Sequence, residues 1–124
     1  MLNKFKLFGI VALLATSLFM TSCSKENMLE GTWNCISLTI DGQSDHSDPW
    51  TFNEGGSFIC GELTGNWTLS GDNLTINGTE DGVTFTMNLN VTELKSKSLK
   101  VNGTIVERYY SESYSATISA SFSK

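Results

Sequence analysis

Helical periodicity and long apolar runs are scarce in this sequence, and each absence excludes a class of protein. From Gly31 onward no long segment repeats apolar residues at a helical spacing, so a helical fold is not expected. The longest apolar run spans residues 7–20 and is broken only by Thr16 and Ser17. It is too short to cross a bilayer comfortably, because a spanning helix needs about 20 residues.

Catalytic motifs are also missing. His46 is the only histidine, and no nucleophile elbow, phosphate loop, dinucleotide fingerprint or zinc-binding helix occurs. The acidic residues fall in turns, which argues against the buried carboxyl pair of a glycosidase. Asp41, Asp45 and Asp48 share a loop with His46, which we interpret as a solvated acidic loop. We therefore predict that the protein is not an enzyme and needs no metal or cofactor.

Positive charge is scarce as well. The chain has 8 Lys and Arg against 13 Asp and Glu, a formal net charge of −5. Lys4 and Lys6 are two of the eight, so residues 23–124 carry a formal charge of −7. An acidic domain repels nucleic acid and anionic lipid headgroups. We expect no nucleic-acid partner and no polybasic patch that assists membrane binding.

Residues 1–22 have the pattern of a cleaved signal peptide. Lys4 and Lys6 precede the apolar run, and the small residue Ser22 follows it. The segment from Leu18 to Cys23 resembles a bacterial lipobox, in which the cysteine receives a diacylglycerol and becomes the first residue of the mature chain. The resemblance implies a lipoprotein held at a membrane by acyl chains on Cys23. The alternative is an ordinary secretory signal and a free Cys23.

Residues 23–29 are short and polar, and predict a lipidated tether ahead of a domain at 30–124. Ser24, after the cysteine, resembles the residue found in lipoproteins that are sorted to the outer membrane. Lys25-Glu26 resembles the export signal of surface-exposed lipoproteins. These resemblances imply an exported protein at the outer membrane, facing the periplasm or the cell surface.

The domain itself has the two-residue period of β-strands. One segment alternates five apolar residues with Thr and Asn, and the last segment repeats the pattern with Ser and Thr. One face of each strand is therefore apolar and the other polar. The five apolar residues are Val83, Phe85, Met87, Leu89 and Val91. We predict eight strands, at about 31–40, 49–53, 57–61, 64–70, 73–77, 82–92, 98–107 and 113–123.

Short turns join these strands. Asp41-Gly42, Asn77-Gly78 and Asp81-Gly82 are typical of tight hairpins. Consecutive strands joined in this way form an antiparallel meander, and eight strands can close into a barrel. In the first strand the phase of Trp33 and Cys35 does not match that of the following apolar residues, which predicts a β-bulge near Asn34-Cys35.

Several segments resemble lipocalin-like domains, which open with a Gly-x-Trp motif on the first strand. Gly31-Thr32-Trp33 supplies this motif, and the segments 50–58, 65–69 and 74–76 match the pattern that follows. The resemblance implies a closed barrel with an internal cavity for a small apolar molecule, and Trp33 packed across the closed end. This domain differs from full-length lipocalins in having only 95 residues and no C-terminal helix pattern.

Six inward apolar side chains are candidates for the cavity lining: Phe52, Trp67, Phe85, Met87, Leu89 and Val101. The alternative is a filled barrel that binds a protein or a glycan through an exposed patch. Tyr109, Tyr110 and Tyr114 flank the loop before the last strand. They form either an aromatic rim for such a partner or ordinary edge packing.

Two cysteines remain once Cys23 is acylated. Cys35 and Cys60 would meet an oxidising compartment in an exported protein, so a disulfide between them is one alternative. It would stabilise the fold by about 3 kcal/mol in the chain-entropy model. The other alternative is two buried free thiols, because the first and third strands of a meander are not neighbours.

Overall fold

The chain folds into an all-β structure. The computed structural model describes residues 25–124, so the predicted signal peptide and Cys23 lie outside the described residues. Nine strands occur in the described part: β1 (Gly31–Ile40), β2 (Gln43–Asp45), β3 (Trp50–Phe52), β4 (Ser57–Cys60), β5 (Leu63–Ser70), β6 (Asn73–Glu80), β7 (Val83–Lys95), β8 (Ser98–Tyr109) and β9 (Glu112–Ser123).

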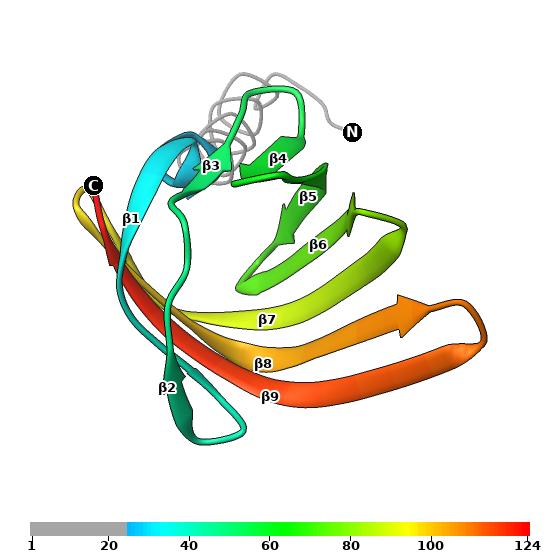
Figure 1. Cartoon of the computed structure of the whole chain (residues 1–124). Coiled ribbons are helices and arrows are strands. Elements are labelled where there is room, and N and C mark those ends of the chain that lie inside the picture. Colours follow the sequence, from blue (N-terminus) through cyan, green and yellow to red (C-terminus); the bar gives the residue numbers. More distant parts are fainter. Residues whose placement is uncertain (1–24) are drawn as a thin grey trace, which may run out of the picture.

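Eight of these strands close into an antiparallel barrel. From β3 to β9 each strand pairs with the next, β3 pairs with β1, and β9 returns to pair with β1 (Figure 1). The predicted eight-stranded antiparallel meander is therefore confirmed. Each of the eight strands lies within a few residues of its predicted position, although β6 continues to Glu80 and β7 to Lys95.

The ninth strand, β2, is absent from the sequence-based prediction. It pairs with the last residues of β1, Leu38 to Ile40, which also pair with β9 (Figure 1). Its three residues are polar and all exposed, so they have no alternation of apolar and polar side chains that could indicate a strand.

The predicted bulge in β1 is present. The pairing of β1 with β9 slips between Cys35 and Ser37, so Ile36 is the extra residue and is 66% exposed. The slip lets both Trp33 and Leu38 point into the barrel although they are five positions apart. Ile36 and Leu38 are two positions apart and would share a face in a regular strand, and the bulge turns Ile36 outward.

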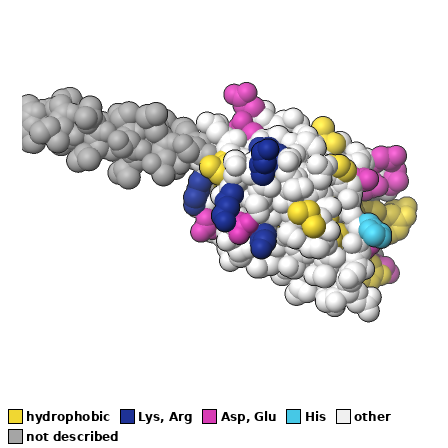
Figure 2. Space-filling view, turned by 90° about the vertical axis from the view of Figure 1, so that its left-hand side faces the viewer, with side chains coloured by type: hydrophobic (Ala, Val, Ile, Leu, Met, Phe, Trp, Pro, Cys, Tyr) yellow, Lys and Arg dark blue, Asp and Glu magenta, His cyan; other side chains and the backbone are white. Residues whose placement is uncertain are grey.

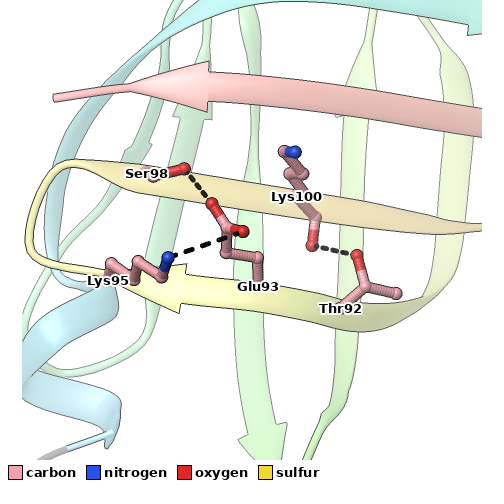
Figure 3. A network of polar contacts seen from close by, with 5 residues as sticks. All are labelled: Thr92, Glu93, Lys95, Ser98 and Lys100. Carbon is pink, nitrogen blue, oxygen red and sulfur yellow. Dashed lines mark hydrogen bonds and ion pairs between the residues drawn. The ribbon is translucent and has the colours of Figure 1, made fainter.

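A second register shift, between Val91 and Glu93, lies near the β7–β8 turn. The Thr92 hydroxyl donates to the Lys100 carbonyl across the shift at 3.3 Å. The Glu93 carboxylate accepts a hydrogen bond from Ser98 and lies 3.9 Å from the Lys95 ammonium (Figure 3). The Ser98 hydrogen bond, with smaller effects of Lys95 and Lys100, holds the pKa of Glu93 below its usual range. These contacts fix the turn that joins the two strands.

The barrel has two distinct ends. The closed end contains the turns at 53–56, 71–72 and 96–97, and the last residues of β9. The open end contains the turns at 41–42, 61–62, 81–82 and 110–111, and the loop at 46–49. Inward side chains between the two ends form one continuous core, in which Leu74, Ile76 and Leu99 are almost fully buried.

Residues 25–29 form a helical turn that packs on the closed end. Leu29 is fully buried in the core, and Lys25 forms an exposed 2.9 Å ion pair with Asp72. Residues 25–29 of the predicted tether at 23–29 therefore pack on the barrel. The reason is the apolar side chain of Leu29, which the barrel buries, whereas Met28 is 38% exposed. Within residues 25–124 no helix has both the length and the apolar character needed to cross a membrane.

Candidate functional site

Aromatic side chains fill the interior at the closed end. The Phe52 ring lies 5.2 Å from the Phe58 ring and 5.5 Å from the Trp67 ring, measured between centroids. Trp50 lies 4.6 Å from Phe122 in the same way. Phe52 and Phe58 are fully buried, and the rings meet tilted or edge to face, the geometry that aromatic pairs prefer. This part of the barrel is a packed core.

Trp33 lies at the closed end, fully buried. Its indole N–H donates to the Leu29 carbonyl at 2.7 Å. The Lys124 ammonium lies 4.7 Å from the centre of its ring and donates to the Met28 and Glu30 carbonyls. Trp33 therefore joins the helical turn, β1 and the end of the chain. Sequence reasoning missed Lys124, because a lysine after a strand looks like any solvated charge.

A cavity of 240 Å³ lies at the open end. Apolar side chains from across the barrel supply most of its wall: Leu38, Ile40, Trp50, Leu63, Phe85, Met87, Ile105 and Ile118. Polar residues complete the lining: Asp45, His46, Ser47, Asp48, Cys60, Glu62 and Glu80. The cavity thus has an apolar interior and an acidic mouth.

Two of the six predicted lining residues, Phe85 and Met87, belong to this wall. Phe52 and Trp67 lie instead in the aromatic core of the closed end, and Leu89 and Val101 are core residues with 3% and 1% exposure. The alternation of a strand tells which face a side chain lies on, but not how far along the barrel it lies. This is why four of the six lie below the cavity.

The loop at 46–49 is held beside the cavity by hydrogen bonds. The Trp50 indole N–H donates to the Ser47 hydroxyl at 2.9 Å, and that hydroxyl lies 3.6 Å from the Cys60 sulfur. The Ser47 hydroxyl also donates to the Asp48 carbonyl at 2.8 Å. Ser47 therefore ties β3, β4 and the loop together beside the cavity.

Cys35 and Cys60 are both free thiols in the structure. Trp33 in β1 pairs with Trp50 in β3, and Trp50 pairs with Cys60 in β4. Cys60 is therefore separated from β1 by two strand spacings of about 4.8 Å each. Cys35 is offset by two further residues, whereas a disulfide needs Cα atoms no more than about 7 Å apart. Burial raises the pKa of both thiols. For Cys60 the Ser47 hydrogen bond offsets part of the rise, and the nearby Asp48 and Glu80 add to it.

Charge is divided between the two ends of the barrel. All five lysines of residues 25–124 lie at the closed end, together with five acidic residues: Lys25, Lys95, Lys97, Lys100 and Lys124, with Glu26, Glu30, Glu54, Asp72 and Glu93. The open half has one arginine, Arg108, and eight acidic residues: Asp41, Asp45, Asp48, Glu62, Glu80, Asp81, Glu107 and Glu112. Figure 2 shows lysine side chains toward one side, with acidic, histidine and exposed hydrophobic side chains at the opposite edge. The formal charge of −7 therefore resides in the open half.

The acidic residues at the mouth have no basic partner among the described residues. The ion pairs of residues 25–124 join Lys25 to Asp72 and Lys95 to Glu93, both at the closed end. Carboxylate oxygens of Glu62, Glu80 and Asp81 lie within 4.8 Å of one another. Three surface carboxylates supply fewer ligands than the roughly six to eight oxygens of a calcium site, and we assign no metal to them.

Three tyrosines stand at the tip of the β8–β9 hairpin. Tyr110 is 89% exposed, and its ring centroid lies 4.3 Å from that of Tyr109. The Tyr114 hydroxyl donates to the Glu112 carboxylate at 2.7 Å, and this contact raises the pKa of Tyr114. The Tyr109 and Tyr110 rings contact each other, and all three side chains are exposed to solvent, which differs from the edge packing that was one expectation.

Comparisons of this chain with protein-family models, with curated proteins and with solved structures gave no match. The architecture defines an eight-stranded antiparallel barrel with one extra strand, which is compatible with a lipocalin-like fold. The candidate site is a small cavity at its open end.

Proposed function

We propose that this chain is an exported, lipid-anchored protein whose barrel binds a small, mainly apolar ligand in the cavity at the open end. The observation that carries the proposal is the cavity itself, which has an apolar wall at one end of an otherwise packed barrel. Ligand sites are concave and mostly apolar, with a few polar groups that orient the ligand. The role is binding without chemical conversion, and nucleic acid is not a partner.

The size of the cavity limits the ligand. The cavity of 240 Å³ is large enough to hold more than a single water molecule. Drug-sized ligands occupy pockets of about 300 Å³ or more. A single short alkyl chain or one substituted ring matches this space.

The position of the cavity also suits a lipid anchor on Cys23. The helical turn at 25–29 packs on the closed end through Leu29 and the Lys25–Asp72 ion pair. Acyl chains attached two residues before Lys25 would hold this end at the membrane. The cavity would then face away from the bilayer, toward the periplasm or the outside of the cell.

A second candidate function is binding of a protein or a glycan at the surface. It is favoured by the exposed rings of Tyr109, Tyr110 and Tyr114, which share the open half with the cavity. Exposed aromatic rings supply contact area at low conformational cost, which suits recognition.

The binding proposal is tested by filling the cavity. Calorimetric titration of residues 24–124 with 1-octanol should give saturable binding, and Ile105→Trp should weaken it by about tenfold or more, because the indole occupies the cavity. The matched control is Ile59→Trp, which adds the same ring at an outward position that is 42% exposed and should leave affinity unchanged. Equal octanol affinity in both variants would contradict the proposed site.

A further inference from the structure

The electrostatics of the open end narrow the class of ligand. Asp45, Asp48, Glu62 and Glu80 line the same cavity as the apolar wall, and no lysine or arginine of the described chain lines it. Three of them are exposed and Glu80 is partly exposed, so they stay solvated beside the space that a ligand would fill.

The surrounding surface reinforces these four carboxylates. The open half carries the domain's full charge of −7, whereas acids and lysines balance at the closed end. A mouth lined by charge of one sign concentrates ligands of the opposite sign and repels those of the same sign. A ligand that carried a carboxylate or a phosphate would be repelled by the mouth. An uncharged ligand would gain no electrostatic attraction from it.

We propose that the ligand is a small cationic amphiphile, an alkyl or aryl amine whose apolar body lies against Met87, Ile105 and Ile118. Its ammonium lies at the mouth, among the carboxylates of Asp45, Asp48, Glu62 and Glu80. This inference rests on the proposed function, since it assigns a class of ligand to the same cavity. The ammonium keeps its contact with water, so binding does not require the costly burial of a charge.

The test uses three probes that share one alkyl chain: 1-octylamine, 1-octanol and octanoate. At neutral pH and low salt, 1-octylamine should bind about tenfold or more tightly than 1-octanol, and octanoate more weakly than either, because several uncompensated carboxylates act on one charge. Added salt should shrink the preference for the amine, since exposed charges are screened.

Variants that replace glutamate with the neutral glutamine show which carboxylates cause the preference for the amine. Glu62→Gln with Glu80→Gln should reduce the ratio of 1-octylamine affinity to 1-octanol affinity, measured on the same variant, toward one. The matched control is Glu26→Gln with Glu54→Gln, which removes the same charge at the closed end and should change neither affinity.

The three probes separate the two proposals. Saturable 1-octanol binding with no amine preference overturns the cationic ligand and leaves the proposed function standing. A preference for octanoate also overturns the cationic ligand. If none of the three probes binds, the proposed function fails and the inference fails with it.

Discussion

Replacing Trp33 with alanine is expected to lower the free energy of unfolding by about 3–5 kcal/mol, the cost of deleting a large buried aromatic side chain. Trp33 has no exposed surface, and its indole N–H satisfies the Leu29 carbonyl at 2.7 Å. Its loss opens a void at the closed end and detaches the helical turn and Lys124 from the barrel. Domains of this size are commonly stable by only about 5–15 kcal/mol, so the variant should be near unfolding.

Urea unfolding followed by circular dichroism measures this effect. Ile36→Ala is the matched control, because Ile36 lies on the same strand but is 66% exposed at the bulge, and we expect a change within about 0.5 kcal/mol. The loss of unfolding free energy for Trp33→Phe should fall between the losses for Trp33→Ala and Ile36→Ala. Phenylalanine keeps a ring but loses the indole hydrogen bond, which is worth about 1 kcal/mol. Similar stabilities for Trp33→Ala and Ile36→Ala would contradict the described role of Trp33.

Replacing Gly65 with alanine is the second substitution for which a large loss is expected. A Cβ atom at Gly65 would lie 1.8 Å from the Asn77 carbonyl oxygen and 2.5 Å from the Gly78 Cα on the neighbouring strand. Both are backbone atoms, so no side-chain rotation relieves the clash and β5 must move away from β6. Overpacking that shifts the backbone costs about 1–3 kcal/mol and occasionally more, and we expect Gly65→Ala to lie at the upper end because both close contacts are with backbone atoms.

The same unfolding measurement applies to Gly65→Ala. Asn66→Ala is the matched control, because it is the next residue on the strand and its side chain is exposed, so a change within about 0.5 kcal/mol is expected. Gly103 has the same restriction, because a Cβ atom there would lie 2.0 Å from the Asn88 carbonyl oxygen. A Gly65→Ala variant as stable as the control would mean that β5 and β6 do not approach this closely.

The barrel was predictable because its strands keep a clean two-residue period. Met87, Leu89 and Val91 alternate with polar residues in β7, and all three are buried. The bulge in β1 was predictable for a related reason: Trp33 and Leu38 cannot both face inward without an extra residue between them, and Ile36 is that residue. Local patterns therefore determine strands, faces and breaks in register.

The height of a side chain along the barrel was not predictable. It depends on the pairing registers, and these are set by the bulges and by turn lengths far away in the chain. Phe85 reaches the open end, whereas Phe52 lies in the core of the closed end, although both are inward aromatic residues on strands. The acidic mouth was missed for the same reason, because Asp45, Glu62 and Glu80 come together only when β2, the β4–β5 turn and β6 are assembled.

Binding of a ligand in the cavity at the open end can be tested with the two thiols as reporters. Cys60 lines the cavity, whereas Cys35 lies outside its lining. Because burial raises the pKa of both thiols and the thiolate is the reactive form, each should alkylate slowly at neutral pH and faster as the pH rises. Peptide mass spectrometry after iodoacetamide treatment measures both rates in one sample of residues 24–124.

We expect a saturating concentration of 1-octanol to slow alkylation of Cys60 severalfold and to leave the rate at Cys35 unchanged. An unchanged rate at Cys60 under saturating 1-octanol, or equal slowing of both thiols, would contradict the placement of the ligand in this cavity.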